Sequence, residues 1–133
     1  MNRNTIAVSY IFRAGSLFFA IIIFILSSIP NPRIPFEFHL GDKFLHLLEY
    51  MLFSLLLFFS FYTSARAFWQ KNAYPFTLLI GAAYGLLDEF HQGFVPGRQR
   101  DFFDFLADLA GVVISLLIAW LLLKAANSKK ITL

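Results

Sequence analysis

The sequence has no cysteine, which excludes a disulfide framework, a thiolate nucleophile and cysteine metal ligands. It also has little charge, since 14% of its 133 residues are charged, against about 25% in a soluble domain. The 11 basic residues are scattered between apolar runs and form no stripe, which excludes a nucleic-acid partner. Apolar side chains make up 59% of the residues, with 18 phenylalanines. This composition indicates a membrane protein whose surface contacts the lipid bilayer.

Four apolar segments are long enough to cross a membrane, because a helix of about 20 residues spans the roughly 30 Å of hydrocarbon. The expected spans are residues 10–29, 43–65, 75–92 and 104–123. The residues after the first span, SSIPNP, lack the small-x-small pattern of a cleavage site, so we expect this span to be retained. The sequence therefore predicts an all-α fold, with one transmembrane domain over residues 1–133 built as a membrane-embedded four-helix bundle.

The basic residues predict how this bundle lies in the membrane. Four spans put both termini on one side and the loops at 30–42 and 93–103 on the other. Seven of the 11 lysines and arginines then lie on the side of the termini, and the side richer in basic residues faces the cytoplasm. We therefore expect a multi-pass protein of the cytoplasmic membrane with both termini cytoplasmic.

The acidic residues and histidines are confined to the outer half of the expected bundle. They are Glu37, His39, Asp42, His46, Glu49, Asp88, Glu89, His91, Asp101, Asp104 and Asp108. In the segments GDKFLHLLEY, LLDEFHQ and DFFDFLAD, polar residues recur every three or four positions, a spacing that places them on one face of a helix. Three helices are therefore expected to turn polar faces toward one another.

Two of these carboxylates lie too deep for the headgroup region. Glu49 lies roughly 9 Å beyond Lys43 along the helix axis, and Asp108 lies about 6 Å beyond Asp104. A charge at the centre of a bilayer costs at least about 2.5–3.5 kcal/mol, so such groups face the bundle interior and pair with one another. We expect a paired, partly hydrated network that opens toward the cell exterior.

Three short motifs occur in order along the chain. They are Asp42-Lys43-x-x-His46-x-x-x-Tyr50, Asp88-Glu89-x-His91-Gln92-x-x-x-Pro96-Gly97-Arg98 and Asp104-x-x-x-Asp108-x-x-Gly111. Together they resemble the VanZ-like family over nearly the whole chain. The resemblance implies a small polytopic protein of the bacterial cytoplasmic (inner) membrane, and the family's namesake is associated with low-level teicoplanin resistance. The family pattern often has Asn at the position of Asp108, so a role that needs an amide there does not carry over.

The first functional hypothesis is a non-enzymatic membrane factor of this type. Its outward-facing polar pocket would bind a lipid-linked envelope precursor or another amphiphile, in a role linked to glycopeptide resistance. Lys43 and Arg98 would hold the anionic group of that molecule, because a guanidinium offers a planar fork of donors. The full set of expected ligand-binding residues is Asp42, Lys43, Glu49, Tyr50, Gln92, Arg98, Asp104 and Asp108.

The alternative is an intramembrane hydrolase or transferase that acts on a lipid or lipid-linked precursor. Its catalytic residues would be His46, Asp88, Glu89 and His91. One histidine would serve as the base and a carboxylate would orient it, while Arg98 would stabilise negative charge. Ser54 lies two turns beyond His46, which disfavours a serine nucleophile, so the chemistry needs a water activated by acid–base or metal-assisted means. No metal or cofactor is identified, because the His-x-x-x-His and cysteine spacings are missing.

Other interpretations stay open beside these two. The network could fix helix packing through interhelical hydrogen bonds, and Arg98 could pair with Asp101, Asp104 or Asp88 instead of a ligand. Homo-oligomerisation is also open. A proton-coupled transporter is a weaker third function, because no ionisable group continues through the inner half of the last three expected spans.

Overall fold

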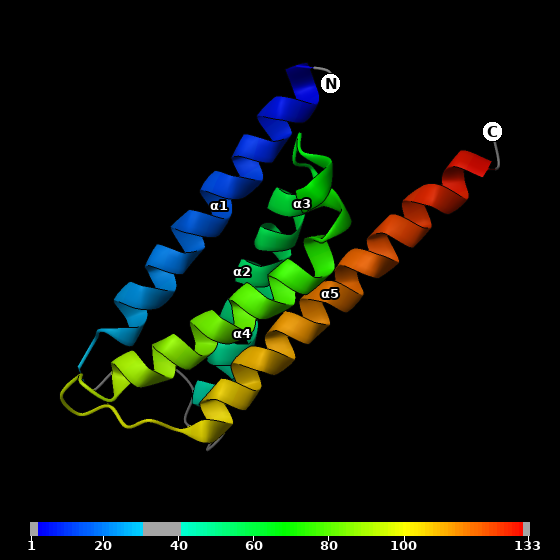
Figure 1. The fold of residues 1–133 in the computed structure, drawn as a ribbon. Coiled ribbons are helices and arrows are strands. Elements are labelled where there is room, and N and C mark those ends of the chain that lie inside the picture. The colour runs from blue at the N-terminus through cyan, green and yellow to red at the C-terminus, as the bar shows by residue number, and fades with distance from the viewer. Residues whose placement is uncertain (1–2, 31–40, 132–133) are drawn as a thin grey trace.

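The computed structural model describes residues 3–30 and 41–131, and within them every regular element is a helix (Figure 1). The helices are α1 (Arg3–Ser27), α2 (Gly41–Tyr62), α3 (Ala67–Lys71), α4 (Ala73–Gln92) and α5 (Phe102–Ile131). The four long helices run alternately in opposite directions, so α1 begins and α5 ends at the same end of the molecule (Figure 1). The all-α prediction is confirmed for this part of the chain, whereas Glu37 and His39 lie outside it.

Three helices are long and apolar enough to cross a membrane, which fits a membrane protein. They comprise Ile6–Ser27, Gly41–Tyr62 and Phe102–Ser128. The fourth expected span, residues 75–92, is present as α4, but α4 does not belong to this set. The reason lies in its last turn and a half, where the segment DEFHQ lowers the mean hydropathy of a 20-residue helix. The prediction of four spans is therefore supported for three helices.

The helix ends differ from the expected spans for local reasons. α2 ends at Tyr62, because the backbone N–H of Ser64 donates to the carbonyl of Phe61 and tightens the chain into a turn. The five-residue helix α3 was not expected, since it is too short to show a period. α5 continues beyond the expected span to Ile131, because the segment KAANSKK that follows residue 123 is rich in the helix formers Ala and Lys.

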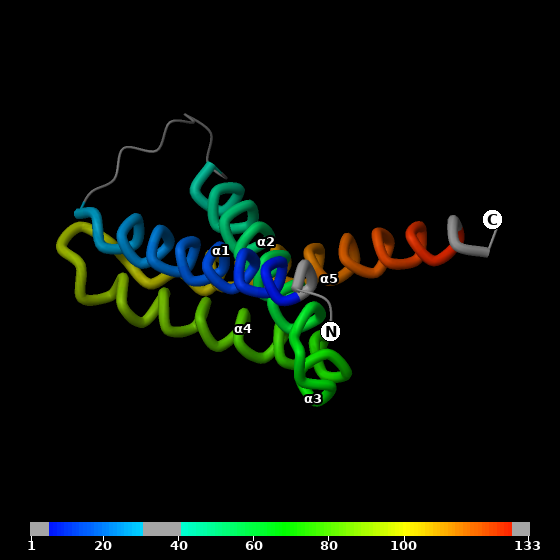
Figure 2. The backbone as a smooth tube through the Cα atoms, turned by 90° about the horizontal axis from the view of Figure 1, so that it is seen from above, coloured from blue at the N-terminus to red at the C-terminus, as the bar shows by residue number. Residues whose placement is uncertain are grey.

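α2 lies at the centre of the bundle and contacts α1, α4 and α5 (Figure 2). Glycines allow the closest approaches. A Cβ at Gly111 of α5 would collide with the backbone carbonyl of Leu47 in α2, so these two helices pack backbone to backbone. A Cβ at Gly81 of α4 would come within 2.8 Å of Val112 in α5. The small-residue pair Gly81-x-x-x-Gly85 therefore acts in helix packing, as its spacing predicts.

The interior of the bundle combines apolar clusters with many polar side chains, and its outer surface is apolar. One buried apolar cluster is formed by Ile23, Tyr50, Phe53, Leu57 and Val112, and a second by Phe58, Ala73 and Ala119. The buried residues nevertheless include more polar than hydrophobic side chains, while large apolar residues such as Leu17 and Leu79 are more than half exposed. An apolar surface of this kind suits contact with lipid. Polar side chains avoid the lipid by facing the interior, where they lie close to one another.

Candidate functional site

The candidate site lies at the end of the bundle where α2 and α5 begin and α4 ends. His46 of α2 and Asp108 of α5 form its deepest pair, with the His46 Nδ1 atom 2.9 Å from the Asp108 Oδ1 atom. The His46 side chain is 7% exposed and that of Asp108 1%. When the ring is neutral, an ionised Asp108 holds the proton on Nδ1, which leaves Nε2 as the basic nitrogen. The pair thus has the geometry of an oriented general base.

Two carboxylates of α4 approach this pair. One ligand atom from each of His46, Asp88, Glu89 and Asp108 lies within 4.8 Å of every other, and all four residues are buried. We call this set the His46 centre. In a second group, formed by Asp42, His46 and Asp104, one ligand atom from each residue also lies within 4.8 Å of the others. Carboxylate oxygens with an imidazole nitrogen are ligands for divalent cations such as Zn²⁺ or Mn²⁺, so either group could hold a metal ion.

Two buried carboxylate oxygens of the His46 centre, Glu89 Oε1 and Asp108 Oδ2, lack a hydrogen-bond partner among the described residues. The hydroxyl of the neighbouring Tyr50 also lacks one. Gly85 of α4 lies directly over two of these residues, since a Cβ there would be 3.1 Å from Asp108 Oδ2 and 3.4 Å from the Tyr50 ring. A buried acceptor without a partner costs about 1–3 kcal/mol, so a water, a cation or a substrate atom that met these oxygens would be stabilised there.

Lys43 covers the outer edge of the centre. Its Nζ atom donates to Asp101 Oδ2 at 2.6 Å and to Asp104 Oδ1 at 2.7 Å. The Lys43 side chain is 28% exposed, whereas that of Asp104 is 5% exposed. The hydrogen bond from Lys43 also holds the pKa of Asp101 below its ordinary value. Lys43, expected to hold an anionic ligand, is thus engaged by two carboxylates of the chain itself.

Asp101 was not among the expected site residues, yet it joins the two outer layers of the site. Its backbone N–H donates to Glu89 Oε2 at 2.9 Å, and its Oδ1 accepts from the backbone N–H of Phe103 at 2.8 Å. The second contact makes Asp101 the N-cap of α5. An aspartate directly before an apolar helical run is a sequence signature of such a cap, and this signature could have identified it.

Arg98 contacts α1 instead of a carboxylate. Its Nη2 donates to the carbonyl of Leu26 at 2.8 Å and its Nε to that of Ile29 at 3.3 Å, at the C-terminal end of α1. Cations at this position satisfy free carbonyls and interact favourably with the helix dipole. Gly97, with a φ of 79°, makes the turn that directs Arg98 there. Among the described residues, its hydrogen bonds therefore do not include the expected pairing with Asp101, Asp104 or Asp88.

Gln92 connects Arg98 to the centre. The Gln92 Nε2 atom donates to Asp88 Oδ2 at 3.1 Å, and its Oε1 accepts from Arg98 Nη1 at 3.5 Å. Gln92 is 2% exposed, so the amide that links Arg98 to Asp88 is shielded from water and lipid. Arg98 thus reaches the acidic cluster through an amide rather than by direct contact.

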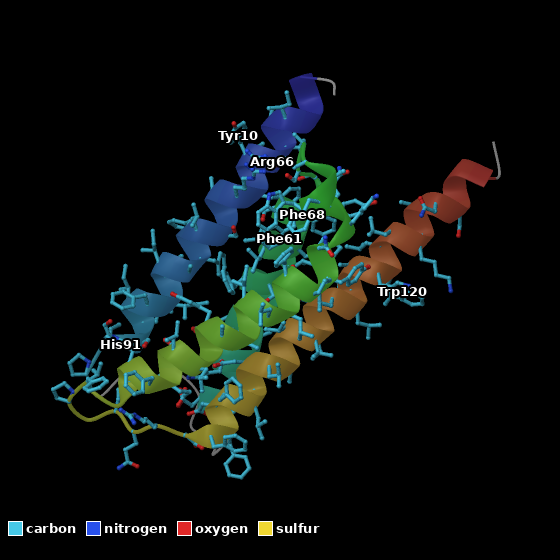
Figure 3. The ribbon with its side chains drawn as sticks, in the orientation of Figure 1. Tyr10, Phe61, Arg66, Phe68, His91 and Trp120 are labelled. Atoms are coloured by element: carbon cyan, nitrogen blue, oxygen red, sulfur yellow. The ribbon has the colours of Figure 1, made fainter. Side chains whose placement is uncertain are left out.

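His91 lies apart from the His46 centre, where the end of α4 meets α1 (Figure 3). Its Nε2 is 2.9 Å from Ser28 Oγ, and its ring packs against Phe24 with centroids 4.8 Å apart. Residues two positions apart on a helix face in nearly opposite directions, so His91 and Glu89 cannot point to the same side. Of the two expected bases, the structure brings only His46 to the carboxylates.

The remaining expected residues line the α2 side of the site. Tyr50 is fully buried and packs edge-on against Phe53, with ring centroids 6.2 Å apart. Asp42 and Glu49 are half-buried, one turn before and one turn after His46. The first three turns of α2 therefore present one continuous polar face to α4 and α5.

Comparison with known families places this geometry in a wider context. Residues 8–123 match the VanZ/LLP1 family, a range that contains every residue of the candidate site. No curated protein and no solved structure matches the chain.

Proposed function

Given that the chain belongs to the VanZ/LLP1 family, we propose that it is a membrane enzyme that acts on a lipid or lipid-linked precursor of the bacterial cell envelope. The reaction would be hydrolysis or group transfer at the His46 centre. One observation carries the proposal: beside the buried imidazole–carboxylate pair of His46 and Asp108, two carboxylate oxygens, Asp108 Oδ2 and Glu89 Oε1, have no partner among the described residues. Such groups are costly unless a substrate, water or cation meets them.

The chemistry follows from the roles that the geometry permits. His46 Nε2 takes a proton from water, and the water oxygen then bonds to the electrophilic atom of an ester or phosphoester in the headgroup. The leaving oxygen departs with the bonding electron pair and receives the proton from His46. Asp108 orients the ring and stabilises the imidazolium that forms. A divalent cation bound by Asp88, Glu89 and Asp108 would supply a lower pKa for the attacking water.

The position of the centre suits a substrate that stays in the membrane. His46 lies in the second turn of α2, so a headgroup reaches it from the interface while the acyl chain remains beside the apolar helix surfaces. Lys43 lies at the entrance and is 28% exposed. An anionic headgroup could replace Asp101 or Asp104 as the partner of Lys43, because the exchange keeps the ammonium paired.

The second candidate is binding of the same class of amphiphile without turnover, in a role linked to glycopeptide resistance. It is favoured by the presence of Lys43 and Arg98 at the same end of the bundle as the acidic cluster. In this function the cations would hold an anionic group, and the buried carboxylates would set its orientation. An enzyme would depend most on His46, whereas a binding protein would depend most on Lys43 and Arg98.

The test uses the purified protein in lipid nanodiscs, incubated with a polar lipid extract from bacterial membranes and analysed by mass spectrometry. We expect product formation by the native chain and none by His46→Ala. His91→Ala is the matched control, because this histidine lies at the same end but contacts Ser28 and Phe24. Retention of a lipid that is lost with Lys43→Ala or Arg98→Ala, with no product in any sample, would favour binding. Equal activity of His46→Ala and the native chain would refute the catalytic proposal.

A further inference from the structure

A recess with polar and apolar walls lies toward the opposite end of the bundle from the His46 centre. It has a volume of about 620 Å³ and lies between α1, the end of α2 and α3. Its polar lining includes Arg13, Ser64 and Arg66, and its apolar lining includes Leu57, Phe61 and Trp69. We call it the arginine recess. Figure 3 shows Phe61 and Arg66 beside α1, close to the labelled Tyr10.

Within the part of the chain that the structure describes, the two arginines of this recess have no acidic partner. All eight Asp and Glu residues of the sequence lie between positions 37 and 108, in or beside the loops at the other end of the bundle. Within residues 3–30 and 41–131, neither Arg13 nor Arg66 forms an ion pair. Arg13 instead donates from Nη2 to Ser64 Oγ at 3.1 Å and lies over the ring of Tyr10. Two guanidinium groups without a carboxylate form a local excess of positive charge, the usual basis of phosphate recognition.

Ser64 adds a hydroxyl donor to this positive charge. Its side chain is almost fully buried, and its Oγ accepts from Arg13 and, at 3.4 Å, from the backbone N–H of Arg66. Because Oγ accepts both bonds, its own proton stays available for an anion in the recess. The three polar groups thus offer only donors to an incoming ligand.

The walls of the recess and the adjacent helix surface are apolar. Trp69 stacks on Phe61 with ring centroids 5.5 Å apart, and Leu57 is buried behind them. Along α1, Leu17 and Ile21 are each more than half exposed and continue the apolar surface away from Arg13. Trp and Tyr side chains are typical of the level at which headgroups meet acyl chains. A ligand with a phosphate and a hydrocarbon chain satisfies both surfaces.

We propose that the arginine recess binds the phosphate of an anionic membrane phospholipid, whose acyl chains lie along the exposed face of α1. This site is independent of the proposed reaction at the His46 centre, because it shares no residue with it. The alternative source of the phosphate is free inorganic phosphate. It would satisfy the arginines and Ser64 but leave the apolar walls without a partner.

The test measures lipid retention by the purified full chain in nanodiscs of phosphatidylcholine doped with phosphatidylglycerol. We expect the native chain to retain phosphatidylglycerol preferentially. Arg13→Gln and Arg66→Gln should each weaken this preference about tenfold, as expected for the loss of one charge-assisted hydrogen bond to a phosphate oxygen. Lys71→Gln is the matched control, since Lys71 is an exposed cation of α3 outside the recess. In about 0.15 M salt its general attraction to the charged surface is screened, so its effect should stay below about twofold.

Each other outcome contradicts the proposal. An equal loss with Lys71→Gln would mean general attraction to a charged surface, and competition by millimolar inorganic phosphate would mean a soluble anion site. Should Arg13→Gln fail to accumulate, Arg66→Gln carries the test alone, because Arg66 is exposed. Unchanged retention by Arg66→Gln then overturns the assignment.

Discussion

At one end of the bundle, carboxylates outnumber cations and are held in contact with His46 and Lys43, whereas at the other end two arginines share a recess without a carboxylate. In most proteins opposite charges lie close enough to neutralise one another. Here the bundle separates them, because no acidic residue lies between positions 1 and 36, 50 and 87, or 109 and 133. Because the two kinds of charge do not pair with each other, the carboxylates remain able to bind a cation and the arginines remain able to bind an anion.

The two ends also differ in burial. The His46–Asp108 pair is closed, with both side chains less than a tenth exposed, whereas Arg13 and Arg66 are exposed. A buried polar group depends on its partner far more than an exposed one does, since water or lipid headgroups cannot replace the lost contact. The acidic end should therefore be sensitive to single substitutions that the arginine end tolerates.

Asp108→Ala tests this difference most strongly. It leaves His46 buried without its carboxylate, and loss of one partner of a buried pair costs about 3–5 kcal/mol of unfolding free energy. Arg13→Ala, which removes one hydrogen bond to Ser64 and an exposed contact with the ring of Tyr10, should cost under about 1 kcal/mol. Both values come from reversible unfolding in detergent micelles. Asp108→Asn is the conservative control, because its amide oxygen still accepts from Nδ1. Similar losses for Asp108→Ala and Arg13→Ala would remove the contrast between the ends.

Divalent cations should stabilise the acidic end alone. At a concentration of Zn²⁺ or Mn²⁺ about 100 times the dissociation constant, binding to the folded state adds about 2.7 kcal/mol. We expect a higher unfolding temperature for the native chain and no shift for Asp88→Asn or Glu89→Gln, two carboxylates of the His46 centre. Asp101→Asn serves as the control, since Asp101 belongs to neither candidate metal group. A shift that survives in both centre variants would place the cation elsewhere.

Sequence patterns predicted the architecture of the acidic end better than its contacts. The apolar runs identify all four long helices, and the spacing of three or four residues places His46 and Asp108 on facing surfaces. Periodicity says nothing of which partner a side chain meets across helices. The sequence therefore predicted that Lys43 and Arg98 would serve the same site, whereas Lys43 bridges two carboxylates and Arg98 caps α1.

Two further differences have simple physical causes. His91 is two residues from Glu89, and helical geometry turns these two side chains to nearly opposite sides, so residues that cluster in the sequence need not meet in space. The arginine recess depends on α3, whose five residues contribute Trp69 but are too few to show a helical period. Sites built from the packing of three elements are visible only once those elements are placed.

The two ends should respond differently to a methyl group at a glycine. Gly85→Ala places a Cβ 3.1 Å from Asp108 Oδ2, and Asp108 cannot turn away without losing His46, so we expect a loss of about 1–3 kcal/mol. Gly15→Ala, two residues beyond Arg13, meets Leu56 at 3.5 Å, which is ordinary contact. Helix propensity then favours alanine, and stability should hold or rise by up to about 1 kcal/mol. Paired unfolding curves decide, and equal effects would show that α4 has room to move.

The smallest expected effect concerns the outermost ion pair of the acidic end. The hydrogen bond from Lys43 lowers the pKa of Asp101 below its ordinary value of 3.8. A depressed folded-state pKa means that the contribution to stability is complete above the ordinary pKa and is lost as the pH falls through the folded-state pKa. Because the Asp101 side chain is 38% exposed, this contribution should stay under about 1 kcal/mol.

Lys43→Gln removes the donor, so its cost in unfolding free energy should be larger at about pH 6 than at about pH 2.5. The same substitution made in the Asp101→Asn background isolates the remaining pairing with Asp104. That remainder should be the more persistent part, because Asp104 is 5% exposed and water replaces its partner less readily. If Lys43→Gln costs the same at both pH values, Lys43 acts through the packing of its hydrocarbon stem. In that case the two ends of the bundle would differ in charge pairing only at the buried pair of His46 and Asp108.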